Sequence, residues 1–176
     1  MTTLLGISGS LRAKSTNTML IRNAAAAFDA DTFIEANLRL PLYDGDLEDA
    51  DGIPPAVQTL SDQIKAADAV VISSPEYNKG ISGVLKNALD WVSRTPGGPW
   101  TGKPVAIMSA TAGRSGGERT QTMLLWSLSY FKPKLIIGPE VLVGQNSQQF
   151  DDAGVLTNEN NRKALTDLMQ RLKAEI

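Results

Sequence analysis

The sequence contains neither cysteine nor histidine among its 176 residues. This excludes disulfides, thiolate nucleophiles, Cys/His zinc sites and histidine general bases, and with them the Ser-His-Asp and Cys-His hydrolases. Lys and Arg number 17 against 19 Asp and Glu, and the resulting net charge of −2 argues against a nucleic-acid binder that relies on phosphate contacts. We expect any difficult chemistry to belong to a cofactor, or to carboxylates with a hard metal ion.

Long apolar runs are also absent. No run approaches the ~18 residues of a membrane span, and the N-terminus lacks the basic flank and apolar core of a signal peptide. We therefore expect a cytoplasmic protein that does not interact with membranes. At roughly 150 residues per domain, the length predicts a single domain over residues 1–176.

Short apolar runs alternate with longer segments in which apolar residues recur at helical spacing. The runs predict strands at 4–7, 32–36, 69–72, 105–108 and, around a Gly138-Pro139 break, 135–143. The longer segments predict helices at 17–28, 56–67, 81–94, 118–131 and 158–176, with a loop rich in Pro, Asp and Gly at 41–55. This alternation predicts an α/β fold with a five-stranded parallel sheet in the order 2-1-3-4-5, covered on both faces.

In such a sheet, ligands bind at the carboxyl ends of the strands near the switch point. The loop after the first strand, residues 8–18, offers hydroxyl groups, backbone N–H groups and the cations Arg12 and Lys14 beside a helix N-terminus, which suits a phosphate. Alternatively, Ser15 or Thr16 only caps the helix and both cations are solvated. The loop is not Gly-x-Gly-x-x-Gly, so a dinucleotide fingerprint is not supported.

Two further polar loops follow the third and fourth strands. Residues 73–83 carry Tyr77 and Asn78, which could line a planar heteroaromatic group or simply form an exposed turn. Residues 109–117 are rich in glycine, which lets the backbone approach a ligand closely, although a flexible connection fits equally well. Glu76 is nearly the only carboxylate in the three loops, so we expect no metal site.

The helix predicted at 118–131 is apolar almost all round its axis, although a helix on one sheet face should keep a polar side. Together with Trp91, it carries more apolar surface than one sheet face can cover. We expect an interface with another subunit, and the alternative is burial under the chain's own loops.

Four segments, taken in order, resemble the NADPH-dependent FMN reductase family. They are Gly6–Arg12 with Ser15 and Asn17, Leu40–Asp44, Ser74–Asn78 continued by Ser82–Trp91, and Gly116–Gln121. The resemblance spans most of the chain, and within the family it is to the bacterial quinone and chromate reductases. It implies a flavodoxin-like three-layer sandwich, in agreement with the sheet order derived above.

The resemblance also implies one FMN per subunit. The phosphate would be bound by Ser10, Arg12, Ser15, Asn17 and Thr18. The isoalloxazine ring would lie along Pro75, Glu76, Tyr77 and Asn78, and its other edge would be bordered by Ser109, Thr111, Gly113, Gly116 and Gly117.

By the same resemblance, NADPH or NADH would donate a hydride to the flavin, which would reduce small-molecule acceptors such as quinones, azo dyes, ferric chelates or chromate. The chemistry would occur at FMN, without a catalytic side chain or a metal, in a homodimer or homotetramer. Arg114 replaces the small residue common in relatives, which leaves the donor and acceptor specificities open. The alternatives are a reductase that supplies reduced FMN to a partner monooxygenase, and a flavodoxin-type electron carrier. A response-regulator phosphoacceptor is disfavoured because residues 8–10 and 73–74 hold no acidic residue.

Overall fold

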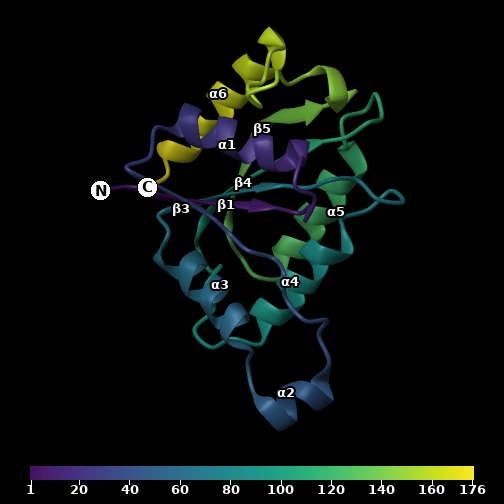
Figure 1. The fold of residues 1–176 in the computed structure, drawn as a ribbon. Coiled ribbons are helices and arrows are strands. Elements are labelled where there is room, and N and C mark those ends of the chain that lie inside the picture. The colour runs from purple at the N-terminus through teal and green to yellow at the C-terminus, as the bar shows by residue number, and fades with distance from the viewer.

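A parallel sheet of five strands forms the centre of the computed structural model, which describes all residues 1–176 (Figure 1). The strands are β1 (Thr3–Ser8), β2 (Thr32–Glu35), β3 (Ala69–Ser73), β4 (Pro104–Ala110) and β5 (Lys134–Val143). Their order is β2-β1-β3-β4-β5 and every pairing is parallel, which confirms the sequence prediction. The register of the β4–β5 pair shifts between Ala106, which pairs with Ile136, and Met108, which pairs with Val141. The Gly138–Pro139 segment of β5 lies within this irregularity.

Helices cover both faces of this sheet, as predicted. The α-helices of the chain are α1 (Thr16–Phe28), α2 (Gly45–Asp51), α3 (Pro55–Ala66), α4 (Gly83–Ser93), α5 (Glu118–Ser129) and α6 (Glu159–Lys173), and all but α2 pack on the sheet. Side chains of α1 and α6 share one hydrophobic cluster with Ala69 and Val71 of β3, and those of α3, α4 and α5 share the other with Val70 and Ile72. None of the helices has the length and apolar character needed to span a bilayer.

The loop prediction for 41–55 is wrong in part, because residues 45–51 form helix α2. Figure 1 shows that α2 projects away from the sheet, and none of its residues is buried. Asp44 caps the helix by accepting a hydrogen bond from the Asp46 N–H at 3.0 Å. Glu48 attaches it to α4 through the Arg94 guanidinium, whose Nε lies 2.9 Å from a carboxylate oxygen.

Trp91 does not contribute to an exposed apolar surface, contrary to our expectation. Its indole is buried, packs edge-on against Tyr43 at a centroid distance of 5.0 Å, and donates to the Pro41 carbonyl at 2.8 Å. Helix α5 is different: Leu124 and Leu128 are buried, whereas Trp126 is 77% exposed. The chain's own loops therefore leave much of the apolar surface of α5 uncovered.

Candidate functional site

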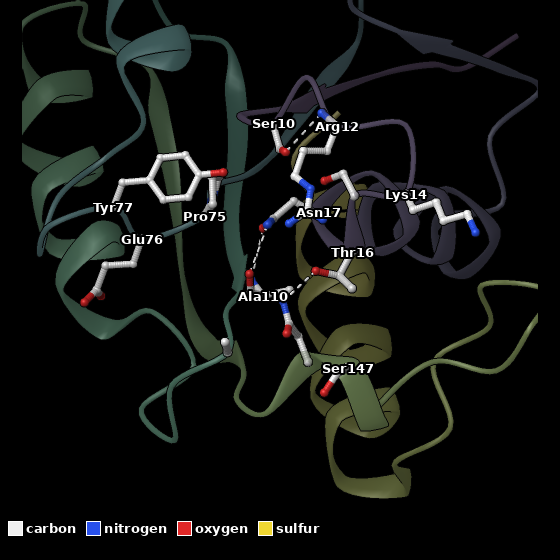
Figure 2. Close-up of a pocket in the computed structure, with 13 residues that line it drawn as sticks. Ser10, Arg12, Lys14, Thr16, Asn17, Pro75, Glu76, Tyr77, Ala110 and Ser147 are labelled. Atoms are coloured by element: carbon white, nitrogen blue, oxygen red, sulfur yellow. Dashed lines mark hydrogen bonds between the residues drawn. The ribbon is translucent and has the colours of Figure 1, made fainter.

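A polar cavity of about 410 Å³ lies at the carboxyl edge of the sheet, where the loops after β1, β3 and β4 meet (Figure 2). Seven of the residues predicted from the sequence line it: Ser10, Arg12, Ser15, Asn17, Pro75, Glu76 and Tyr77. Six others complete the wall: Lys14, Thr16, Ala110, Ala112, Asn146 and Ser147. The structure therefore brings the first and second loops together around one cavity, as the position of the switch point predicted.

The loop after β1 ends at the first turn of α1. Ser15 is the N-cap of this helix, and its Oγ accepts a hydrogen bond from the Thr18 N–H at 3.3 Å. The other first-turn N–H groups have no carbonyl partner within the helix. Because the positive end of the helix dipole and the cations Arg12 and Lys14 adjoin these groups, this end of the cavity suits an anion.

Asn17 connects three elements beneath the cavity. Its Nδ2 donates to the Ala110 carbonyl at 3.0 Å, while its Oδ1 accepts from the Ala110 N–H at 3.1 Å and from the Ser73 hydroxyl at 2.8 Å. The side chain is 3% exposed, so these bonds form in a buried environment where unpaired groups are costly. Asn17 thus joins α1 to the ends of β3 and β4 and retains one N–H that these bonds do not use.

Thr18 does not line the cavity, since its hydroxyl donates to Ser8 Oγ at 2.9 Å. Together with the Ser15 cap, this bond fixes the start of α1 against the end of β1. The side chains of Ser15 and Thr18 therefore shape the loop that a phosphate would approach.

The loop after β3 turns back on itself through a two-residue hairpin. Tyr77 and Gly80 exchange backbone hydrogen bonds of 3.0 and 3.1 Å, and Asn78 and Lys79 between them adopt positive φ angles of 51° and 68°. Asn78 lies at this turn and not in the cavity wall. Figure 2 shows the Tyr77 ring extending toward the first loop, whereas the Glu76 carboxylate points away from it.

The end of β4 and the loop after it contribute Ala110 and Ala112 to the cavity, whereas the predicted residues of this segment do not line it. Buried Ser109 donates to the Gly116 carbonyl at 2.6 Å and accepts from Gln121. Gly116 and Gly117 have φ angles of 65° and 98°, and a Cβ on Gly116 would lie 2.5 Å from the backbone of Leu142. The backbone groups of Thr111 and Gly113 form hydrogen bonds with the end of β5 and the segment after it, at Val143, Gln145 and Asn146.

The segment after β5 also belongs to the site, which was not predicted from the sequence. Asn146 and Ser147 begin the short helix η1 (Asn146–Gln148) and line the cavity, with Asn146 Nδ2 donating to Thr16 Oγ1 at 2.7 Å. Because β5 pairs with β4 in parallel, its carboxyl end reaches the same edge of the sheet. The polar run directly after the last apolar strand was a usable signal in the sequence.

The fold and this cavity define a flavodoxin-like α/β protein with a polar cleft at the carboxyl edge of its sheet. Residues 2–148 match the family model described as NADPH-dependent FMN reductase. The chain is 41% identical over 172 residues to an NAD(P)H-dependent FMN reductase of Pseudomonas aeruginosa, covering 97% of this chain and 92% of the relative. The chain belongs to the NADPH-dependent FMN reductase family.

Two further proteins support this membership. The quinone reductase of Escherichia coli strain K12 is 36% identical over 176 residues, with 94% of each chain covered. The solved structure of FerB, a flavoenzyme NAD(P)H:(acceptor) oxidoreductase from Paracoccus denitrificans, superposes with a TM-score of 0.87 at 30% identity, covering 99% of this chain and 96% of FerB.

Proposed function

We propose that this chain is an FMN-containing oxidoreductase that transfers two electrons from NADPH or NADH to quinones or similar small acceptors. The observation that carries the proposal is the cavity itself, in which a cationic helix N-terminus lies opposite an aromatic loop. Family membership and the quinone reductase relatives support the same activity. When bound, FMN supplies the ability to accept a hydride and to pass on two electrons.

The cavity fits FMN at its phosphate end. A terminal phosphate needs cations and free N–H donors, and both occur where Arg12 and Lys14 adjoin the first turn of α1. In this proposal Ser10, Arg12 and Thr16 bind the phosphate directly. Ser15, Asn17 and Thr18 act mainly by holding the loop, since their side chains already make the bonds described above.

The opposite end suits a planar ring. Pro75 and Tyr77 present flat, largely apolar surfaces on one side, and the glycine-rich backbone at 113–117 adjoins Ala112 on the other. We assign the edge of the ring to the backbone of Thr111, Gly113, Gly116 and Gly117, shaped from below by Ser109. Asn146 and Ser147 are additional polar groups for the chain that links the ring to the phosphate.

The chain's own residues bind and orient the reactants in this proposal, and none acts as a nucleophile. A single FMN-binding domain over residues 1–176 would work in the cytoplasm, where NAD(P)H is available. The exposed side chains of Met123 and Trp126 on α5, and of Tyr130 at its C-cap, support assembly into a homodimer or homotetramer through this helix.

Flavin selectivity tests the proposal directly. FMN-free protein is titrated separately with FMN, FAD and riboflavin while flavin fluorescence is followed. We expect FMN to bind most tightly, because the first loop recognises a terminal phosphate. Riboflavin has no phosphate, and in FAD the corresponding phosphate is part of a diphosphate and is not terminal. Binding of FAD in preference to FMN, or no binding of any flavin, would overturn the proposal.

A further inference from the structure

Helix α5 begins without a cap from its own N-cap residue. Gly117 occupies that position with a φ angle of 98° and has no side chain to accept a bond from the first turn. The Thr120 N–H is one of the groups left without a helical partner. It donates instead to Glu76 Oε2 at 3.3 Å. The loop after β3 therefore caps the helix that follows β4.

The Thr120 side chain strengthens this connection. Its hydroxyl donates to the Pro75 carbonyl at 3.0 Å and lies 3.0 Å from Ser74 Oγ. Thr120 and Ser74 are fully buried, so water does not compete for these bonds. Residues 74–76 are thus hydrogen-bonded to both the backbone and the side chain of Thr120 in the first turn of α5.

Tyr77 is held between two such contacts. Glu76 and Thr120 connect the chain to α5 on its N-terminal side. On its C-terminal side, Gly80 lies so close to α5 that an added Cβ would be 2.8 Å from Met123 Sδ. The backbone on either side of Tyr77 therefore lies against α5, and Figure 2 shows the ring extending from there toward the first loop.

The Glu76 carboxylate also lies beside positive charge from Arg119 and from the N-terminus of α5. Its side chain is 15% exposed, and Oε1 lies 4.0 Å from Arg119 Nη1. The positive end of the α5 dipole adjoins the same carboxylate. Glu76 therefore balances positive charge beside the ring end of the cavity, which it also lines.

We propose that Glu76 is a positioning residue, and that its carboxylate holds Tyr77 in place through α5 while balancing the charge of Arg119 and the helix N-terminus. This inference rests on the proposed function, in which FMN occupies the cavity. Reduced flavin is more negative than oxidised flavin, so a nearby carboxylate disfavours the reduced form and lowers the reduction potential of bound FMN.

Two substitutions separate the two roles. Glu76→Gln keeps an oxygen acceptor for the Thr120 N–H but removes the charge, whereas Glu76→Ala removes both. Glu118→Gln is the matched control, because Glu118 is an exposed carboxylate in the same first turn and its side chain forms no hydrogen bond or ion pair with the loop after β3. The dissociation constant of FMN and the midpoint potential of bound FMN are measured for each variant.

We expect Glu76→Ala to raise the dissociation constant of FMN about tenfold, the factor for one charge-assisted hydrogen bond. Glu76→Gln should bind FMN within about threefold of the parent, consistent with retention of the neutral bond. The two-electron midpoint potential of FMN bound to Glu76→Gln should become more positive by about 30 mV. This shift corresponds to a tenfold gain in the binding of reduced FMN relative to oxidised FMN. Glu118→Gln should change neither quantity.

Parent-like FMN affinity in Glu76→Ala would overturn the positioning role. An unchanged potential in Glu76→Gln, or an equal shift in Glu118→Gln, would overturn the electrostatic role. If Glu76→Ala does not fold, Glu76→Asp tests the same contact, because it keeps the charge but shortens the reach of the carboxylate toward the Thr120 N–H; parent-like FMN affinity in Glu76→Asp would then overturn the positioning role. Failure of the parent to bind FMN would instead refute the proposed function.

Discussion

Replacing Arg12 by alanine tests how the cavity would recognise a phosphate. The Arg12 side chain makes no hydrogen bond or ion pair within the chain, although its backbone N–H bonds to Ser10 Oγ at 3.4 Å. The substitution therefore removes nothing that holds the fold together. We expect the free energy of unfolding of the FMN-free protein to change by less than about 0.5 kcal/mol.

The whole effect should fall on FMN binding. A hydrogen bond between a guanidinium and a phosphate contributes about 1.5–3 kcal/mol, and about 1.4 kcal/mol corresponds to a tenfold change in affinity. Arg12→Ala should then raise the dissociation constant of FMN about 10- to 150-fold. Arg12→Lys keeps the charge but loses the two-pronged geometry, and it should give a smaller loss.

Riboflavin provides the control, since it shares the ring and the ribityl chain but has no phosphate. Titrations of the parent, Arg12→Ala and Arg12→Lys with FMN and riboflavin are followed by flavin fluorescence. Riboflavin affinity should be the same in all three proteins. Arg12 does not recognise the phosphate if Arg12→Ala binds FMN as well as the parent does, or if it loses equal affinity for FMN and riboflavin.

Four further predictions concern the framework and its chemistry. Asn17→Ala should lower the free energy of unfolding in urea by about 3 kcal/mol, because it leaves buried partners unpaired; a loss below about 1 kcal/mol would contradict this. Trp126→Glu should shift the sedimentation of an oligomer toward the 18.8 kDa monomer, and a parent that is already monomeric would refute the interface. A hydrogen bond from Arg94 lowers the pKa of Glu48, so their contact stabilises α2 at neutral pH and is lost as the pH falls through that lowered pKa. The protection factors of the amides in residues 44–51, which are corrected for the intrinsic exchange rate at each pH, should accordingly be lower in acid than at neutral pH, and in Glu48→Gln they should be low already at neutral pH; protection factors in the parent that do not fall in acid would contradict this contact's role. Prolonged EDTA treatment should leave NAD(P)H-dependent quinone reduction unchanged, whereas a loss that magnesium restores would show that a metal participates.

The architecture was readable from the sequence because its signals are local. Val70, Val71 and Ile72 form an apolar run without polar alternation, which is typical of a strand buried on both faces, and all three are buried in β3. Of the two residues that the sequence offered as a cap for the first helix, Ser15 and Thr16, Ser15 is the N-cap. Helix α2 escaped prediction because contacts from α4, and not an apolar face of its own, hold it in place.

The site was predicted less completely because its bonds join distant parts of the chain. Asn17 bonds to Ala110, which is 93 residues away, and Asn146 bonds to Thr16, which is 130 residues away. A motif indicates that such side chains gather at one edge of the sheet, but not which of their donors are already used. The direction of the Glu76 carboxylate, toward α5, is likewise determined by tertiary packing.

The most direct test of the central claim is an anaerobic titration of the FMN-loaded protein with NADPH, followed by addition of a quinone. If bound FMN carries the electrons, the visible absorption of the flavin is bleached by one equivalent of NADPH per bound FMN and is restored by one equivalent of quinone. The flavin should remain with the protein throughout, as judged by gel filtration. A bound FMN that neither NADPH nor NADH bleaches, or a bleached flavin that quinone does not reoxidise, would contradict the central claim.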